Sequence, residues 1–274
     1  MAKILEIKEM KNMARLIKAQ GVLAVLLLSV MLPVSAQYKM VVYTNGGTRT
    51  EFWASNVDSV TWEYSEPYTP VDSMIHVGYE YVDLGLSVKW ATMNVGAAKP
   101  EDYGYYFAWG ETEPRTEYNW TTYKYCKGSR NTITKYCDDS DYGNDGFTDN
   151  KSILDLDDDA AHVNWGGSWR MPTLEEMKEL IDNCTWIWTT MNGYNGYKVQ
   201  SNQPGYTDNW IFLPASGCRY NSLLSNEGSY GYYWSSTLSA DYSRDAYGLV
   251  FFSNNIGWYY NYRYNGYSVR PVCP

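Results

Sequence analysis

The residues of this chain that are best suited to recognition lie between positions 228 and 267. This tract holds 10 Tyr, 6 Ser, 5 Gly and 4 Asn, and it contains no Lys. Tyr and Trp rings give large, rigid contact areas that lose little entropy on binding, while Ser, Asn and Gly give adaptable hydrogen bonding. The same composition is poor in groups that transfer protons or attack a carbon atom. It therefore predicts a ligand-binding surface rather than a catalytic centre.

The candidate ligand-binding residues lie in turn-rich parts of this tract or at alternating positions of a predicted strand. They are Tyr230, Tyr242, Arg244, Asn254, Asn255, Trp258, Tyr260, Tyr262 and Tyr264. Because side chains alternate along a strand, Tyr260, Tyr262 and Tyr264 are expected to point to one side. Aromatic faces can stack on sugar rings and can equally anchor a protein epitope, so the predicted partner is a protein or carbohydrate ligand at the cell surface. The alternative is that half-exposed rings merely decorate a β domain.

This sequence contains few residues that could bind zinc or act as a catalytic histidine. The histidines are His76 and His162, and no Cys-x-x-Cys pair occurs. Zinc sites and catalytic dyads need several such groups close together. The sequence therefore predicts that the protein is not an enzyme.

The five cysteines leave two alternatives open. Cys126 and Cys137 lie 11 residues apart around a predicted turn, and a disulfide between them would close a loop. An exported chain is allowed disulfides, but an odd number of cysteines leaves at least one thiol unpaired within the chain. The alternative is that all of them are buried thiols.

The acid-rich region between Asp138 and Asp159 is the candidate for a bound Ca²⁺, which prefers clustered oxygen ligands. Aligned from Asp141, the EF-hand template places Gly143 where a ligand is needed and Ser152 where a Glu is needed. A solvated acidic loop fits this pattern better. We therefore predict no cofactor, with Ca²⁺ as the alternative.

Residues 1–36 have the pattern of an export signal. Five basic residues precede an apolar run at 21–32, and small residues precede Gln37. The run is shorter than the ~20 residues of a membrane span, so we predict cleavage after Ala36 and a processed chain that does not span a membrane. The predicted location is the periplasm, the outer cell surface or the medium.

The charge of the chain argues against one class of partner. Removing residues 1–36 takes away five basic and two acidic residues and changes the net charge from −9 to −12. A chain this acidic repels nucleic acid and anionic lipid. The oligomeric state is left open.

The order of the predicted elements indicates the domains and the fold class. Residues 37–64 read as a small β-hairpin unit around the turn 45–47, residues 65–76 as a linker, and residues 77–274 as one globular domain with a packed loop at 119–159. Thr173 and Glu176 form a capping box at the start of one helix, and short strands follow it. This order predicts an α+β fold in which a helix packs on a twisted, mainly antiparallel sheet.

Three sequence blocks resemble the Fibrobacter succinogenes major paralogous domain family. They read VDLGLSVKWATMNVGAAKPEDYGYYFAWGETE, DDAAHVNWGGSWRMPTLEEMKELI and YGYYWSST…GYSVRPV, and the resemblance extends over roughly residues 77–272. The resemblance implies a C-type-lectin-like fold related to that of the formylglycine-generating enzyme. It also implies that Trp169 and Arg170 are scaffold, that Arg170 satisfies buried carbonyls or an acid, and that Arg270 is paired. The core positions predicted in the last block are Trp234, Leu249, Phe251 and Val269.

The chain lacks the catalytic and sugar-binding residues of the active proteins that share that fold. The enzyme chemistry needs a reactive cysteine pair near the last strands, and residues 230–272 contain no cysteine. The sugar-binding loops of calcium-dependent lectins are also absent from the sequence. The leading hypothesis is therefore an exported, non-enzymatic binding protein, and the alternative is a structural or assembly module of the bacterial envelope or a surface appendage.

Overall fold

A computed structural model describes residues 39–43, 49–53, 73–76 and 78–274, which fall into two units, Met1–Glu66 and Pro67–Pro274. In the first unit, β1 (Lys39–Tyr43) and β2 (Arg49–Trp53) pair antiparallel, as expected from the turn between them. The predicted export signal at 1–36 lies outside the described residues, as does the predicted linker up to residue 72. The last four linker residues instead form a strand, β3 (Ser73–His76), in the second unit.

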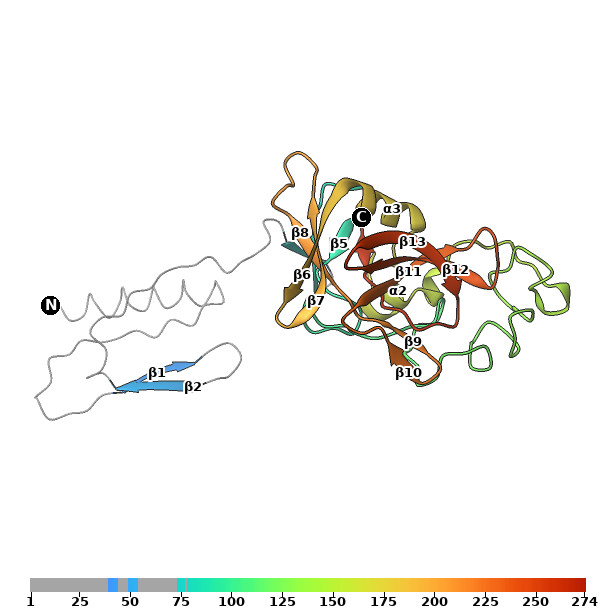
Figure 1. Ribbon diagram of the computed structural model, residues 1–274, viewed down its shortest axis with the longest axis horizontal. Coiled ribbons are helices and arrows are strands. Elements are labelled where there is room, and N and C mark those ends of the chain that lie inside the picture. The colour runs from blue at the N-terminus through green and yellow to red at the C-terminus, as the bar shows by residue number, and fades with distance from the viewer. Residues whose placement is uncertain (1–38, 44–48, 54–72, 77) are drawn as a thin grey trace, which may run out of the picture. The chain divides into compact units, whose positions relative to one another are not determined.

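Within the described residues, the second unit has four antiparallel sheets (Figure 1). The sheet that carries the Tyr-rich tract has the order β11-β12-β13, with β11 at Tyr230–Leu238, β12 at Asp245–Phe252 and β13 at Asn255–Tyr262. A second sheet contains β6 (Cys184–Met191), β7 (Tyr194–Ser201) and β8 (Trp210–Pro214). A third has the order β14 (Val272–Cys273), β5 (Lys89–Ala91), β4 (Tyr79–Val82) and β3. The fourth is a hairpin of β9 (Cys218–Tyr220) and β10 (Leu223–Ser225).

The helices are few and short. α3 (Leu174–Asn183) begins at the predicted capping box, in which the side chains of Thr173 and Glu176 each accept a hydrogen bond from the other's backbone N–H. The remaining helical segments are α2 (Ala160–Trp165) and the 3-10 turns η2 (Asn144–Gly146) and η3 (Leu156–Asp158). Strands make up 37% of the structure and helices 11%. The predicted α+β class is therefore wrong, and the fold is mainly β. The resemblance to a C-type-lectin-like arrangement stays a prediction.

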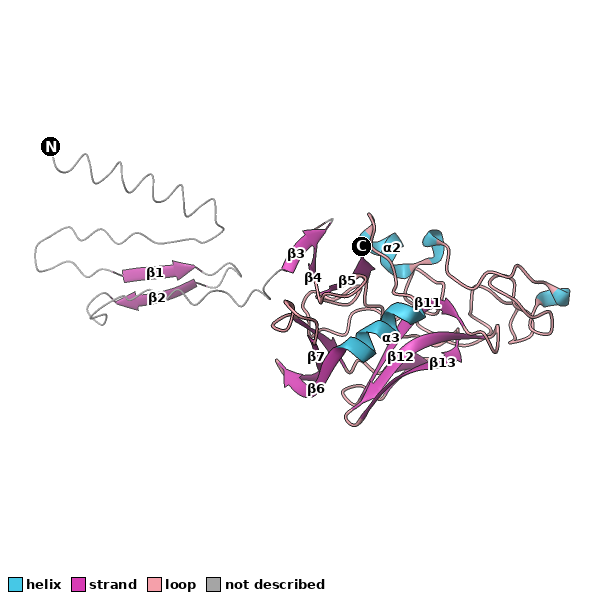
Figure 2. Cartoon of the chain, turned by 90° about the horizontal axis from the view of Figure 1, so that it is seen from above, coloured by secondary structure: helices cyan, strands magenta, loops and turns pink. Residues whose placement is uncertain are grey.

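The fold class was predicted wrongly because a capping box and an apolar periodicity are local features of the sequence. They identify a helix but do not show how much of the core that helix covers. α3 buries one face, with Leu174, Met177 and Leu180, against the sheet β11-β12-β13 (Figure 2). The strands and irregular segments supply most of the other buried apolar side chains. One short helix therefore covers part of a sheet and does not form a layer.

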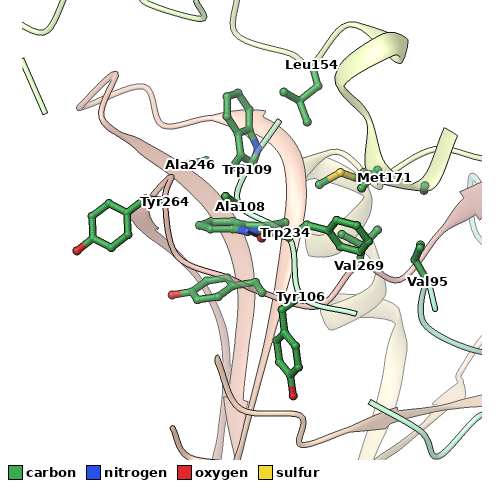
Figure 3. Packing of buried hydrophobic residues seen from close by; sticks show 14 of the residues in the cluster. Val95, Tyr106, Ala108, Trp109, Leu154, Met171, Trp234, Ala246, Tyr264 and Val269 are labelled. Atoms are coloured by element: carbon green, nitrogen blue, oxygen red, sulfur yellow. Dashed lines mark hydrogen bonds between the residues drawn. The ribbon is translucent and has the colours of Figure 1, made fainter. Parts of the chain in front are cut away.

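The core of the second unit is rich in aromatic rings. Trp234 stacks on Tyr267 with ring centroids 4.1 Å apart, and its Nε1 donates to the carbonyl of Phe107 at 2.9 Å. Figure 3 shows Trp234 in the buried cluster to which Ala108 and Val269 also belong. The four core positions predicted from the sequence are confirmed as buried: Trp234, Leu249, Phe251 and Val269.

Arg270 is a fully buried cation that bonds to no carboxylate within the described residues. Its Nη atoms donate to the carbonyls of Ala91, Thr92 and Phe212 at 2.8–3.0 Å, and its Nε donates to the side chain of Asn94. Burial lowers the pKa of this guanidinium to about 10, so the side chain is still charged at neutral pH. A single side chain thus joins the end of β5 and the residue after it to strand β8. Arg270 was predicted to be paired, and its partners are mainly backbone carbonyls. Arg170 was predicted to bond buried carbonyls or an acid, and it pairs with the carboxylate of Glu176.

Arg263 is fully buried as well, and it comes directly after β13. Its guanidinium donates to the carbonyls of Lys135, Tyr136 and Ser243 at 2.9 Å, and its Nε donates to the hydroxyl of Tyr123. The predicted packed loop at 119–159 is therefore held against the end of β13 by hydrogen bonds from one residue. This loop contributes side chains to the surface described below.

The carbonyl bonds of Arg270 give a first prediction. Arg270→Met should lower the free energy of unfolding by about 3 kcal/mol or more, because each buried acceptor left without a donor costs about 1–3 kcal/mol. Urea unfolding at neutral pH measures the loss. The control is Arg219→Met, because Arg219 is partly exposed and lies 5.2 Å from the ring of Tyr106. Equal losses in the two variants would contradict the role given to Arg270.

Candidate ligand-binding surface

Strand β13 is the outer strand of its sheet and pairs on one side only, with β12. Within the described residues no strand pairs with its other side, and several of its side chains are exposed. Trp258 is 45% exposed, Tyr259 47%, Tyr260 42% and Tyr262 37%. We call these four residues the aromatic edge. Because β12 beside them is largely buried, the rings stand on a rigid support.

One face of β13 carries a row of rings that continues beyond the strand. Tyr247 of β12 lies between Trp258 and Tyr260, with centroid distances of 5.7 and 6.1 Å. Tyr242, from the loop before β12, lies 5.7 Å from Tyr260. At the other end, the ammonium of Lys178 in α3 lies 4.9 Å from the Trp258 centroid. The face is therefore a continuous aromatic platform with a cation beside it.

Arg244 lies at the Tyr262 end of this platform. Its guanidinium lies 4.9 Å from the ring of Tyr242, 5.4 Å from Tyr142 and 5.7 Å from Tyr262, which are cation–π distances. Its Nε is buried and has no hydrogen-bond partner within the described residues. The nearest carboxylate, Asp245, is 3.7 Å from that atom, which is too long for a hydrogen bond. Arg244 is therefore positioned by rings and leaves hydrogen-bonding capacity unused.

Asp245 lies beneath the platform and is 4% exposed. Burial raises the pKa of its carboxyl to about 6, although the charges of Arg244 and Arg263 act in the opposite direction. Its Oδ1 has no hydrogen-bond partner within the described residues. The carboxyl therefore gains and loses its proton in a mildly acidic range rather than near pH 4.

The opposite face of the sheet carries a second, shallower group of aromatic side chains. A hollow of about 260 Å³ there is lined by Tyr232, Val250, Phe252, Asn255, Tyr259 and Asn261, and Tyr260 borders it as well. Tyr230 stacks on Tyr232 with centroids 5.9 Å apart and lies 5.0 Å from Phe252. The Asn255 amide donates to the Tyr259 hydroxyl at 3.2 Å. This face therefore offers apolar rings with amides and hydroxyls at their rims.

The structure places the nine predicted site residues on two faces of the sheet, in one turn and in the core. Trp258, Tyr260 and Tyr262 share one face with Tyr242 and Arg244, while Tyr230 and Asn255 belong to the other face. Asn254 is exposed in the turn between β12 and β13. Tyr264 departs from expectation, because the strand ends at Tyr262 and Tyr264 is 5% exposed, in contact with Trp120 and Tyr220.

Two residues that contribute to the surface were not predicted from the sequence. Tyr259 is the most exposed ring of the aromatic edge, and strand alternation places it opposite Trp258 and Tyr260. That alternation was visible in the sequence, but the fact that β13 is an edge strand was not. Tyr142 reaches Arg244 from the loop at 119–159, more than a hundred residues away in the chain, and no local pattern predicts this contact.

The acid-rich loop uses its carboxylates within the protein. Asp149 accepts hydrogen bonds from the backbone N–H groups of Tyr136 and Cys137, and Asp158 accepts from the hydroxyls of Tyr125 and Tyr136. Lys135 beside Asp158 helps to hold the pKa of that carboxyl at about 2, against the effect of burial. In the part of the chain that the structure describes, no three His, Cys, Asp or Glu residues are grouped so as to hold a metal ion.

All five cysteines are free thiols, including Cys126 and Cys137. The Cys137 thiol donates to the carbonyl of Asp139 at 3.2 Å, and the Cys126 thiol donates to that of Trp120 at 3.0 Å. Burial raises the pKa of both thiols, which makes them poor nucleophiles at neutral pH. Of the two alternatives left open by the sequence, the structure therefore has the unpaired thiols and not the Cys126–Cys137 disulfide.

Comparison with known families gives one match. Residues 186–272 match a domain family of unknown function, DUF8237. The matched segment runs from β6 to the start of β14 and includes the whole aromatic edge. No curated protein and no solved structure matches the chain. Among the described residues, no helix is long and apolar enough to cross a membrane.

The buried Asp245 carboxyl gives a prediction about pH. A folded-state pKa of about 6, against 3.8 for the ordinary group, means that the folded chain holds this proton more tightly than the unfolded chain does. The Asp245 contribution to stability is therefore largest below pH 3.8 and declines as the pH rises to about 6. Asp245→Asn removes this dependence, so its gain in urea midpoint over the parent should be larger at pH 7.5 than at pH 4.5. A gain that is equal at both pH values would contradict the assignment.

Proposed function

We propose that this chain is a non-enzymatic binding protein whose ligand surface is the aromatic edge, together with Tyr242 and Arg244. The observation that carries the proposal is the exposure of four consecutive or alternating rings on both faces of one strand. Exposed apolar patches of this kind mark interaction sites on soluble domains. The ligand is a protein or a carbohydrate, since aromatic faces suit both.

The support beneath the rings favours binding. Strand β13 keeps an unbroken register with β12 from Asn255 to Tyr262, so the backbone is already ordered before a ligand arrives. Tyr247 and Lys178 restrict the rings of Trp258 and Tyr260 from the side. Preorganised side chains lose less entropy on binding, so more of their contact energy appears as affinity.

The titratable groups of the surface are suited to hydrogen bonding and not to proton transfer at neutral pH. Partial desolvation, and to a smaller extent the charges of neighbouring groups, raise the pKa of Tyr260, so its hydroxyl stays protonated at neutral pH. Asp245 titrates near pH 6 but lies beneath the rings, with its Oδ1 out of contact with solvent. A general base must reach the proton that it removes. This geometry supports recognition of a ligand without its conversion.

We also propose that the chain is exported and acts in the periplasm, at the outer cell surface or in the medium. The support is the signal pattern of residues 1–36. Expression in the source cells, followed by mass spectrometry of the purified protein, should give a mature chain that begins at Gln37. A cell-associated protein that retains residues 1–36 would contradict export by this route.

The surface itself is tested by a triple variant, Trp258→Ala, Tyr260→Ala and Tyr262→Ala. Glycan arrays and pulldowns of surface proteins first identify a ligand of the parent chain, and the variant should lose that ligand. Its melting temperature should stay within a few degrees, because the three side chains are 37–45% exposed.

A matched control removes exposed side chains elsewhere. Tyr105 is 50% exposed, Ile187 45% and Leu223 64%, so the triple alanine variant at these positions removes similar exposed apolar area. This control should bind as the parent does. The proposed function fails if the aromatic-edge variant keeps every ligand that the parent binds.

A further inference from the structure

The outer side of β13 presents unpaired peptide groups. The N–H of Arg263 donates to the carbonyl of Arg244 at 3.2 Å, which fixes the hydrogen-bonding phase of the two strands. In an antiparallel pair, alternate residues bond to the neighbouring strand, so the odd-numbered residues of β13 face β12. The N–H and C=O groups of Ile256, Trp258 and Tyr260 point away from it. None of these groups has a hydrogen-bond partner among the described residues.

This edge lacks the features by which proteins usually prevent strand pairing. Edge strands are normally protected by charged residues, proline, a bulge or a covering segment. The sequence of β13, NIGWYYNY, contains no charged residue and no proline. Its register with β12 has no bulge, whereas the β11–β12 pair is irregular between Trp234 and Leu238. An edge strand without charges, proline or a bulge is open to an additional strand.

Two hollows border β13, one on each face of the sheet. The hollow on the α3 side has a volume of about 320 Å³ and is lined by Lys178, Ile181 and Asp182 of α3 and by residues 256–259 of β13, so that Tyr259 borders both hollows. The hollow on the other face is the one of about 260 Å³ that Tyr232, Phe252 and Tyr259 help to line. An added strand presents its side chains alternately to the two faces. Successive side chains of such a strand would therefore enter the two hollows in turn.

A cation is available at one end of the edge. Arg244 contacts the ring of Tyr262, is 20% exposed, and has a buried Nε without a partner among the described residues. Guanidinium groups bond carboxylates in a planar, two-pronged geometry. A carboxylate carried by an incoming strand beside Tyr262 would be a better partner for Arg244 than Asp245 is.

We propose that the ligand of the aromatic edge is an extended polypeptide segment of another protein, which pairs with β13 as a fourth strand of the sheet and places an acidic side chain against Arg244. The inference rests on the proposed function, because it names the ligand of the same surface. A sugar ring stacks on one face of a platform, whereas this surface has rings and hollows on both faces of a strand with free peptide groups. A second copy of the chain fits less well, since each copy carries a net charge of −9 and the copies repel each other.

The probe is a library of synthetic, N-acetylated octapeptides that have Val, Ile, Thr or Tyr at alternating positions and Glu at either end. Binding to the full chain is measured by fluorescence polarisation, and the tightest peptide is used in hydrogen exchange. The amides of Ile256, Trp258 and Tyr260 should exchange rapidly in the free chain and at least roughly tenfold more slowly with peptide, because each gains a partner. The amides of Gly257 and Tyr259, which face β12, should be protected in both states.

A pair of variants distinguishes the contribution of the Tyr260 peptide N–H to binding from that of the Tyr260 ring. Tyr260→Ala removes the ring, and Tyr260→Pro also removes an N–H that points away from β12. Proline is tolerated at such a position of an edge strand, so the sheet should remain folded, as the melting temperature checks. Tyr260→Pro should bind the peptide roughly tenfold more weakly than Tyr260→Ala does. Arg244→Gln should weaken binding of peptides with Glu but not of the same peptides with Gln.

The outcomes distinguish this inference from the proposed function. If no library peptide slows the three outward amides, or if Tyr260→Ala and Tyr260→Pro bind equally, the strand-pairing proposal is overturned. A glycan that binds the parent and is lost in the aromatic-edge variant would still support the binding function. If the three amides of the chain alone become protected as its concentration rises, the occupant is a second copy, and the proposal is likewise overturned.

Discussion

The placement of the surface depends on the buried guanidinium of Arg263. This side chain joins three segments that have little regular structure in common: the loop at 119–159, the loop before β12 and the end of β13. A buried charge is costly unless all its donors are satisfied, so the carbonyls that it bonds cannot move independently. Tyr142 and Tyr242 belong to two of the segments held in this way, and they contact Arg244. The hydrogen bonds of the buried Arg263 thus hold in place the segments that carry the surface residues.

Arg270 bonds backbone carbonyls in the same way elsewhere in the domain, and together the two arginines help to hold irregular chain within a mainly β fold. A loop buried without partners would leave polar backbone groups unsatisfied. Each guanidinium offers five N–H donors in a fixed plane and so satisfies several carbonyls at once. Asp149 and Asp159 do the reverse, since their carboxylates accept hydrogen bonds from backbone N–H groups. The irregular segments are therefore ordered by buried ionic side chains in addition to the backbone hydrogen bonds of their turns and isolated bridges.

This organisation sets the limit of what the sequence predicted. Signals that act within a few residues were read correctly, including the capping box at Thr173, the strands of the Tyr-rich tract and core positions such as Trp234. The fold class was wrong because the clearest local signal belonged to a helix of only ten residues. Tyr264 was misplaced because Arg263 turns the chain into the core one residue earlier. The contact of Tyr142 with Arg244 depends on long-range bonds that no periodicity records.

The edge character of β13 connects these points to function. A strand in the middle of a sheet with the sequence NIGWYYNY would bury its rings and read as core, and only its position at the edge turns the same residues into a surface. An uncharged edge is an aggregation risk for an isolated domain. The net charge of −9 offsets that risk at long range, because like-charged copies repel, while the Debye length of about 8 Å at physiological salt leaves the edge itself open to a partner once it is in contact. The acidic composition and the neutral strand are thus complementary: the first keeps copies of the chain apart, and the second leaves a site where a different polypeptide can pair.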